Sequence, residues 1–439
     1  MNNQELYLHA KEIIPGGTHL FGKRPEHQAP GVFPPYFKAV KGCYVTDYDG
    51  RELLDFTSCG IGACLLGAND DEVTEAVIKV IRDGNFSTLN PPEEVELADR
   101  LLGIHPWSSW AKFARSGGEV CGVAARIARA ATGKSKIMVI GYHGCQDWYL
   151  ATNLLSPEAL NGLWLSNLSP YGVPKELTGT AIPCMHGDTQ MFNDLLKIHG
   201  NDLAAVFVEP CRHELPEPGF LEALRAGCDK YGAMLVYDEI TIGWRYCFGG
   251  SHLALNRAEP DIAVFSKAMG NGHPVAAVIG NDRSRCGADK AFLSSTYWTE
   301  RSGSAAALAT INKMERTQVH KHVNAYGEKC FALWKAAGEK TGLPVKITSK
   351  FGCLATFSFE TPYPEVRTLF VTKMLERGIL VTTAFYPTLS HGDREFEAYS
   401  QAVYEVFAEI ADLAAQGEAA VKAASCGPVT VSGFGRLVK

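Results

Sequence analysis

Short apolar runs that end in a polar or charged side chain are the feature that most constrains the fold of this chain. Met234–Tyr237 is followed by Asp238, and Ile262–Phe265 is followed by Ser266 and Lys267. Runs of this length, bounded by turn residues, are typical of strands buried on both faces of a sheet. In open α/β sheets the ligand lies at the carboxyl ends of the strands, so we expect Asp238 and Lys267 to face one ligand.

Two further apolar runs follow the same pattern. Ile137–Ile140 leads to Tyr142 and His143, and Val206–Val208 leads to Glu209. Helical patterns fill the intervals, and this alternation predicts an α/β fold with right-handed crossovers and a mostly parallel central sheet. One edge of that sheet would gather an aromatic ring, a histidine, two acids and a lysine, which is a set suited to an aromatic cofactor.

The pair of Asp238 and Lys267 meets the chemical needs of pyridoxal 5′-phosphate (PLP). A lysine forms an imine with the carbonyl of this cofactor, and a carboxylate pairs with its pyridine nitrogen. The alternative is a solvated lysine and an acid that caps the next helix. Taken singly, Tyr142 indicates core packing and His143 an ordinary turn histidine; taken together, the strand ends favour a cofactor site.

The segment Arg115–Glu119 reads RSGGE and precedes a run with apolar residues at helical spacing. The free N–H groups of Gly117 and Gly118 at such a helix start predict an anion site, although an ordinary helix cap explains them as well. A P-loop is excluded because Ala128 stands where that motif needs glycine. No G-x-G-x-x-G follows a strand-like run, so a nicotinamide fingerprint is absent.

Composition excludes several classes of protein. A chain of 439 residues should contain two or more domains, and a net charge of −6 does not favour nucleic acid as a partner. The 13 cysteines are scattered, which indicates reduced thiols and no metal site. The start lacks a signal-peptide pattern and no apolar run is long enough for a bilayer, so we expect a cytoplasmic protein without membrane insertion.

The domain prediction has three parts. Residues 1–50 would be an N-terminal segment that packs with the small domain, 51–314 a large PLP-binding domain, and 315–439 a small α+β domain. The last stretch, 425–439, is small, polar and Gly-rich and predicts a tail. Helices are expected near 3–14, 71–82, 92–103, 221–231, 304–319, 321–341, 364–377 and 394–415, and strands near 36–40, 44–46, 53–56, 345–347, 355–358 and 379–381.

Several motifs in register carry a resemblance to a known family. The segments are RSGGEVCGVAARIARAATGK, GYHG, VFVEPCRHE, YGAMLVYDEITIGWR, FSKAMGNGHPVAAVIG and STYWTERSGSAAALATI, in this order. Over nearly its whole length the chain resembles the class III aminotransferases of fold type I, in the branch similar to glutamate-1-semialdehyde aminomutase. The resemblance implies a PLP-dependent fold type I transferase, with a mostly parallel sheet in a large domain and a smaller α+β domain.

The resemblance also implies roles for the residues at the strand ends. Lys267 would bind the cofactor covalently and then move the proton between the substrate carbon and the cofactor. Asp238 would keep the pyridine nitrogen protonated, so that the ring acts as an electron sink. Tyr142 would cover one face of the ring, and Glu209 would lie near its phenolic side with His143 close by.

The phosphate site and the assembly are implied in the same way. Gly117 and Gly118 would donate backbone N–H groups to the phosphate, and Thr296 would reach it from a neighbouring subunit, which implies a homodimer with shared active sites. The family usually has threonine or serine where this chain has Gly118. A phosphate-binding hydroxyl is therefore lost here, and N–H groups or water must replace it.

The reaction type depends on a second pattern. Glu209-Pro210, followed by Glu214, resembles the transaminases, whereas aminomutases usually lack this pair. In transaminases the later glutamate pairs with an arginine that moves aside for a glutamate donor, so Glu214 is a candidate switch residue. The matching C-terminal arginine is not found around residues 384–387.

Candidate substrate-binding cations are spread along the chain. Lys23 and Arg24 fall near the place where aminomutases carry a substrate-binding arginine. Arg212 and Arg245 are further candidates because a guanidinium suits a carboxylate. For each of these cations, a solvated role at the surface is the alternative.

Two runs, TYWTER and YPTLSH, resemble sugar-modifying members of the branch. Joined to the Glu209-Pro210 and Glu214 pattern, this resemblance implies a ping-pong transfer of an amino group from an amino acid, glutamate, to an aldehyde or keto sugar. The acceptor would be the aldehyde at C8 of an acidic eight-carbon sugar, in lipopolysaccharide biosynthesis. One alternative is glutamate-1-semialdehyde 2,1-aminomutase. Another is a non-catalytic PLP-fold sensor or paralogue, but the residues before Pro15 are too few for a DNA-binding module and Lys267 is present.

Overall fold

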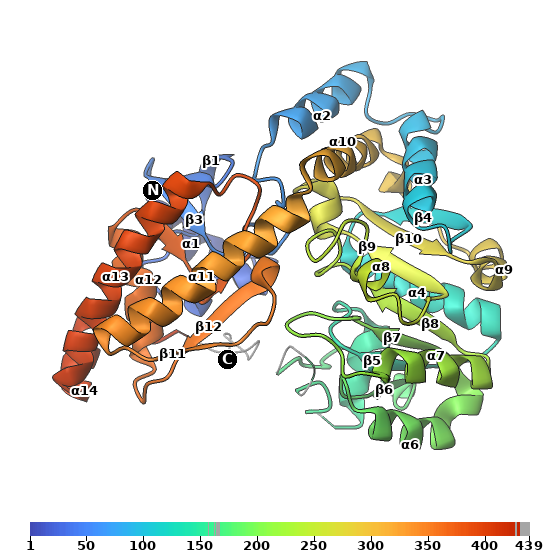
Figure 1. Ribbon diagram of the computed structural model, residues 1–439. Coiled ribbons are helices and arrows are strands. Elements are labelled where there is room, and N and C mark those ends of the chain that lie inside the picture. The colour runs from blue at the N-terminus through green and yellow to red at the C-terminus, as the bar shows by residue number, and fades with distance from the viewer. Residues whose placement is uncertain (157, 162, 164–166, 426–427, 431–439) are drawn as a thin grey trace. The chain divides into compact units, whose positions relative to one another are not determined.

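The computed structural model describes residues 1–439 except 157, 162, 164–166, 426–427 and 431–439 (Figure 1). The described chain forms two compact units. The central unit is Asp71–Gln318, and the terminal unit combines Met1–Asp70 with the described residues after Gln318. The functional division at residues 51 and 315 that the sequence suggests stays a prediction.

A seven-stranded sheet organises the central unit. Four neighbouring pairs are parallel, from β9 through β8, β7 and β5 to β6, whereas β10 is antiparallel to both of its neighbours. The predicted mostly parallel sheet is confirmed, and the four apolar runs form β5, β7, β8 and β9. The strand order is β4 (Trp110–Ala114), β10 (Ala276–Gly280), β9 (Ile262–Phe265), β8 (Met234–Asp238), β7 (Leu203–Val208), β5 (Lys136–Ile140) and β6 (Ala181–Pro183).

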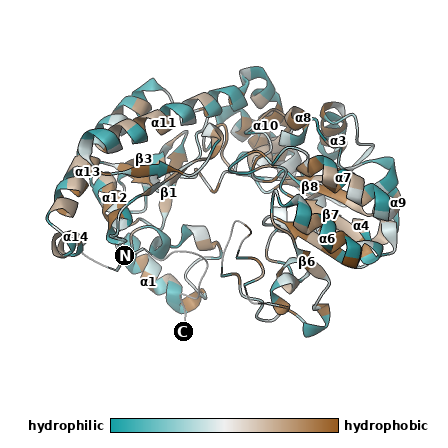
Figure 2. Cartoon of the chain, turned by 60° about the horizontal axis from the view of Figure 1, so that its bottom comes forward, coloured by the Kyte–Doolittle hydropathy of each residue, from teal (hydrophilic) through white to brown (hydrophobic). Residues whose placement is uncertain are grey.

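Helices cover this sheet because both of its faces are apolar. The helix α4 (Gly117–Thr132) packs across β7, β8, β9 and β10 and also against α9 (Asp282–Lys290). Alternate strand residues face α4 in one core, which accounts for the apolar runs. The helix α7 (Phe220–Tyr231) packs against β7 and β8 and also against α6 (Thr189–His199). In Figure 2 the strands are largely brown, whereas α9 is mostly teal.

The remaining elements of the central unit frame the sheet. The helix α10 (Arg301–Thr317) packs against α2 (Asp71–Asp83) and α3 (Pro92–Ile104). The described residues also include two short helices, α5 (Asp147–Leu150) and α8 (Ser251–Leu255), and two 3₁₀ turns used below, η6 (Lys267–Gly270) and η7 (Thr296–Thr299).

The terminal unit joins the two ends of the chain in one sheet. The order is β1 (Phe37–Lys41), β2 (Tyr44–Asp47), β3 (Glu52–Phe56) and β13 (Ile379–Val381), and β3 runs parallel to β13. A second sheet has the order β11 (Val345–Ile347), β12 (Ala355–Phe359) and β14 (Ala384–Phe385). The helices are α1 (Asn3–Ile13), α11 (Val319–Thr341), α12 (Glu365–Glu376), α13 (Asp393–Ala415) and α14 (Glu418–Ala424).

The helices and strands expected from periodicity are confirmed within a few residues of their predicted ends. The sequence did not predict α14, which ends just before the predicted tail. Most of the predicted tail at 425–439 lies outside the described residues. Within the part of the chain that is described, none of the helices combines the length and the apolar character needed to cross a membrane.

Candidate active site

The candidate site lies at one edge of the central sheet. Because β9, β8, β7 and β5 are adjacent and parallel, their carboxyl ends meet at this edge. These ends carry, in the same order, Lys267, Asp238, Glu209 and Tyr142. The structure therefore brings together the four strand ends that the sequence predicted.

The Asp238 carboxylate is buried and fixed by three donors. Its exposed fraction is 2%. The His143 Nδ1 donates to Oδ2 at 2.8 Å, the Cys121 thiol to the same oxygen at 3.6 Å, and the Ile240 amide to Oδ1 at 3.0 Å. The other ring nitrogen of His143, Nε2, is buried and has no partner among the described residues. The bond from His143 to Asp238 was not predicted from sequence.

Lys267 begins the η6 turn in a strained backbone conformation, with φ +46°. Left-handed φ values in non-glycine residues persist only where the surroundings impose them, and they cluster at functional sites. The Lys267 amine donates to Thr241 Oγ1 at 2.9 Å. Burial, and then the positive charge of Arg212, lower the pKa of Lys267 to about 8. A lysine with such a pKa has more of the neutral, nucleophilic amine near neutral pH.

Glu209 anchors the next strand end. Its buried carboxylate accepts the Tyr142 amide at 3.0 Å and the Arg212 Nη1 at 3.1 and 3.2 Å. Gly141 has φ +128°, and a Cβ there would lie 2.7 Å from Glu209 Oε2, so only glycine fits. Burial raises the pKa of Tyr142 to about 12, and its ring meets the ring of Tyr149 edge-on at 5.9 Å. The ion pair with Arg212 was missed, although the spacing of three residues was visible in the sequence.

The glycine loop opens α4 as the sequence predicted. Ser116 caps the helix: its hydroxyl accepts the Glu119 amide at 3.4 Å, while Glu119 Oε2 accepts the Ser116 amide at 2.8 Å. The N–H groups of Gly117 and Gly118 then lie in the first turn, where no helical carbonyl precedes them. A Cβ at Gly117 would lie 3.0 Å from Ile240 Cδ1, so the helix start packs closely on the loop after β8.

Thr296 lies in the exposed η7 turn, and an arginine holds that turn in place. Arg115 donates to the carbonyl oxygens of Tyr297 at 2.8 Å, Trp298 at 2.7 Å and Glu300 at 3.0 Å. It also forms an ion pair with the Glu300 carboxylate at 3.0 Å. Arg115 thus connects the start of α4 to the segment that carries Thr296, a role that the sequence analysis did not assign.

The other predicted substrate-binding residues have varied settings. Arg245 is fully buried. Its positive charge lowers the pKa of Lys267, in addition to the larger effects of burial and of Arg212. Glu214 is exposed. Lys23 and Arg24 belong to the terminal unit, where Lys23 is exposed and Arg24 stacks on the Phe21 ring at 4.1 Å. A substrate role for these four residues stays a prediction.

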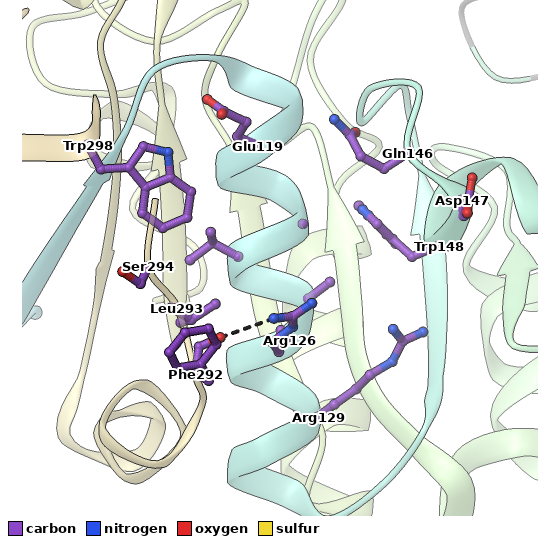
Figure 3. Close-up of a pocket in the computed structure, with 13 residues that line it drawn as sticks. Glu119, Arg126, Arg129, Gln146, Asp147, Trp148, Phe292, Leu293, Ser294 and Trp298 are labelled. Carbon is purple, nitrogen blue, oxygen red and sulfur yellow. Dashed lines mark hydrogen bonds between the residues drawn. The ribbon is translucent and has the colours of Figure 1, made fainter. Parts of the chain in front are cut away.

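A cavity of about 690 Å³ lies beside α4 (Figure 3). Its wall includes Arg126 and Arg129 on the helix, Gln146 and Trp148 on a neighbouring segment, and Phe292 to the left of the helix in this view. Neither Lys267 nor Asp238 lines it. The cavity is therefore adjacent to the glycine loop but separate from the edge that carries the titratable residues.

The residues at the sheet edge fit PLP. A buried carboxylate can pair with the pyridine nitrogen, a lysine amine of lowered pKa can attach to the carbonyl carbon, and a helix start with two glycines can receive the phosphate. The unpaired Nε2 of His143 leaves a polar contact for a further group. Fold and site together define a PLP-dependent enzyme of fold type I.

The chain belongs to the class III aminotransferases, because the model of the family Aminotransferase class-III matches residues 27–392. The protein is therefore a PLP-dependent transaminase of this class. Its similarity to the 3-aminobutyryl-CoA aminotransferase of Cloacimonas acidaminovorans is 30% identity, covering 93% of this chain and 97% of the relative. The 2'-deamino-2'-hydroxyneamine transaminase of Streptomyces kanamyceticus is 31% identical, over 88% and 95% of the two chains.

A third relative belongs to the aminomutase branch. The glutamate-1-semialdehyde 2,1-aminomutase of Methylacidiphilum infernorum is 28% identical, over 92% of this chain and 96% of its own. Among solved structures, the FumI protein of Sphingopyxis sp. MTA144, in its PLP internal aldimine form, matches with a TM-score of 0.85 and 25% identity. That match covers 95% of this chain and 98% of the other.

Proposed function

We propose that this enzyme moves the amino group of glutamate to the aldehyde of 8-oxo-3-deoxy-manno-octulosonate, and so acts as an 8-amino-3,8-dideoxy-manno-octulosonate transaminase. The glutamate C2 becomes a keto carbon, and the sugar aldehyde carbon becomes an aminomethyl carbon, so oxidation and reduction balance. Glutamate would bind first and leave as 2-oxoglutarate before the sugar binds, which is a ping-pong order. The TYWTER and YPTLSH runs and the transaminase relatives support this reading.

The observation that carries the proposal is the ion pair of Arg212 with Glu209 next to Lys267. Both proposed substrates have a carboxylate, and a guanidinium binds that group well. Glu209 balances the charge of the half-buried Arg212 side chain when no substrate is present. We infer that Arg212 binds the substrate carboxylate at the edge of the site.

The other residues have roles that follow from their contacts. When bound, PLP would supply an electron sink for the substrate carbon that loses its proton. Lys267, whose pKa is lowered, would take up and return that proton. Asp238, held by His143, would pair with the pyridine nitrogen. The family resemblance implies that Tyr142 would cover one face of the ring.

The proposed assembly is a homodimer with shared active sites. Thr296 is exposed in the single chain, and so are large apolar side chains in its neighbourhood and in the segment before α3. The exposed fractions are 84% for Phe292, 66% for Tyr297 and 79% for Leu89. Exposed large apolar residues of this kind favour burial against a second protein surface.

The test is the first half-reaction with glutamate alone. Purified enzyme with bound PLP should lose its visible band at roughly 400–430 nm and release 2-oxoglutarate in an amount equal to the sites. Adding the sugar aldehyde should then restore the band and give the C8 amine. Arg212→Lys should weaken glutamate binding while leaving PLP binding intact, because a lysine cannot form the bidentate contact.

The second candidate is glutamate-1-semialdehyde 2,1-aminomutase, which the relative from Methylacidiphilum infernorum favours. An aminomutase returns the amino group to the molecule that supplied it, so no keto acid is released. If glutamate and other common amino donors leave the spectrum unchanged while glutamate-1-semialdehyde is isomerised, the aminomutase assignment replaces the transaminase proposal and the sugar acceptor is rejected with it.

A further inference from the structure

A side-chain amide occupies the space beside Gly118. An ideal Cβ built on Gly118 would lie 2.5 Å from Gln146 Nε2 and 3.0 Å from Gln146 Oε1. No side chain at position 118 is compatible with this placement of Gln146. The space that a side chain at position 118 would take is therefore filled by a polar group from another segment.

A second glycine completes the space for this amide. Gly144 has φ +108°, and a Cβ there would lie 2.6 Å from Gln146 Oε1 and 3.1 Å from the Gly118 Cα. The amide thus lies in a gap between two glycines, one in the first turn of α4 and one in the loop after β5. Figure 3 shows Gln146 beside the N-terminal turn of α4, level with Glu119.

The amide of Gln146 is incompletely satisfied. Its Oε1 is buried and has no hydrogen-bond partner among the described residues. Burying an unpaired polar atom is unfavourable, so such an atom indicates a missing partner. A rotation of the amide by half a turn presents the NH₂ group at the same place, and an NH₂ group is a donor for an anion.

The hydroxyl nearest in sequence cannot replace the one missing at Gly118. The Ser116 hydroxyl is committed to the helix cap, since it accepts the Glu119 amide at 3.4 Å and donates to Glu119 Oε2 at 3.1 Å. Gly117 and Gly118 contribute only N–H groups. A side-chain donor at this helix start must therefore come from outside the loop.

We propose that Gln146 is a phosphate-binding residue, whose side-chain NH₂ donates to the phosphate of PLP and replaces the hydroxyl that residue 118 lacks. The inference rests on the proposed function, in which that phosphate binds at Gly117 and Gly118. A neutral amide adds a hydrogen bond without adding charge. A bond to a charged acceptor of this kind corresponds to a roughly 10- to 100-fold gain in affinity.

The experiment compares PLP with pyridoxal, which lacks the phosphate. Dissociation constants of both are measured on cofactor-free enzyme by absorbance and protein fluorescence, for the natural chain and for Gln146→Ala and Gln146→Met. We expect PLP to bind either variant roughly 10- to 100-fold more weakly, with pyridoxal affinity changed by less than about twofold. Gln146→Glu should lose more, because a carboxylate of the same shape repels the phosphate.

A rescue and a control make the assignment specific. Gly118→Thr on the Gln146→Ala background should recover PLP affinity, because the amide no longer fills the space of the new side chain. Gln190→Ala is the matched control, since the exposed Gln190 amide donates to Asp194 within α6. It should leave both affinities unchanged.

Two results would overturn the inference. Equal losses of PLP and pyridoxal affinity would mean that Gln146 supports the fold and not the phosphate. Unchanged PLP affinity in Gln146→Ala or Gln146→Met would remove it from the site. A different result is expected if the PLP phosphate does not bind at Gly117 and Gly118. The natural chain itself would then show no preference for PLP over pyridoxal, or Gly118→Asp would bind PLP as well as the natural chain does.

Discussion

At the scale of single residues, the site depends on charges held in fixed positions inside the protein. Asp238 is buried, with His143 as its closest donor, and the Lys267 amine meets Thr241. Neither group is free to reorganise, because each is bonded to a neighbouring segment. Such fixed groups stabilise charge without the cost of moving solvent.

Asp238→Asn should retain PLP but lose turnover, on the order of 100-fold or more. The neutral amide cannot hold a proton on the pyridine nitrogen, and the ring then accepts electrons poorly. Steady-state rates and the absorbance of bound PLP are measured on the same preparation. Near-normal turnover with full PLP occupancy would remove Asp238 from the proposed role.

The lowered pKa of Lys267 predicts a pH-dependent stability of the cofactor-free enzyme. The pKa is about 8 in the folded protein against 10.5 for a free lysine, so the unfolded chain binds more protons between these values. Stability should therefore rise from pH 8 to 10.5, and the cost of the charged lysine, up to about 3 kcal/mol, should be fully present below pH 8.

Denaturant unfolding of Lys267→Met checks this sign. The variant should be more stable than the natural chain at pH 7, and the difference should shrink as the pH approaches 10.5. Lys290→Met, which changes an exposed lysine at the end of α9, should show no such trend. A difference that stays constant with pH would mean that Lys267 is not desolvated.

At the scale of elements, the sequence predicted the strands well because their apolar runs and turn residues are local signals. β5, β7, β8 and β9 lie where the runs of apolar residues placed them. The antiparallel β10 was not predicted as such, although its cause was visible in the sequence. Only residues 266–275 connect it to β9, and a parallel crossover needs a longer connection.

Contacts between distant segments could not be predicted in the same way. His143 bonds Asp238 across 95 positions, and Arg115 bonds Tyr297 across 182. Both contacts depend on the strand order of the sheet, which no local pattern specifies. The same holds for Gln146 and Gly118, whose proximity is visible only once β5 and α4 are placed. Residue types at the site were therefore predictable, but their partners were not.

Arg115 gives a prediction at this scale. Arg115→Met removes three hydrogen bonds to carbonyl groups of η7 and its surroundings, and it leaves the nearly buried Glu300 carboxylate without its ion pair. We expect faster hydrogen exchange of residues 297–303 and a loss of about 3 kcal/mol in unfolding free energy. Mass spectrometry after deuterium exposure measures the first effect.

The control for this variant is Arg285→Met, which changes an exposed arginine of α9 whose ion pair with Asp289 is long, at 4.0 Å. That variant should leave exchange in the 297–303 segment unchanged. Equal protection of this segment in Arg115→Met and the natural chain would show that other contacts hold η7.

At the scale of the whole molecule, the proposed homodimer makes Thr296 a residue of the neighbouring site. Mixing Lys267→Ala with Thr296→Ala should then create mixed dimers with one intact site, formed by Lys267 of one subunit and Thr296 of the other. We expect activity and tight PLP binding to appear in the mixture after subunit exchange, although each variant alone is impaired.

The result depends on which subunit completes the site. If Thr296 serves the site of its own chain, no combination in the mixture contains both residues, and the activity stays that of the separate variants. A fully active monomer at micromolar concentration, observed by sedimentation, would contradict the proposed assembly directly.

The central claim is that PLP is bound covalently to Lys267, at the edge of the sheet where Asp238, Glu209 and Tyr142 meet. The most direct test is borohydride reduction of the purified enzyme followed by peptide mapping. We predict loss of the visible band at roughly 400–430 nm and a pyridoxyl group on the peptide that contains Lys267. Lys267→Ala should give no labelled peptide. A pyridoxyl group on a different lysine of the natural chain would contradict the account.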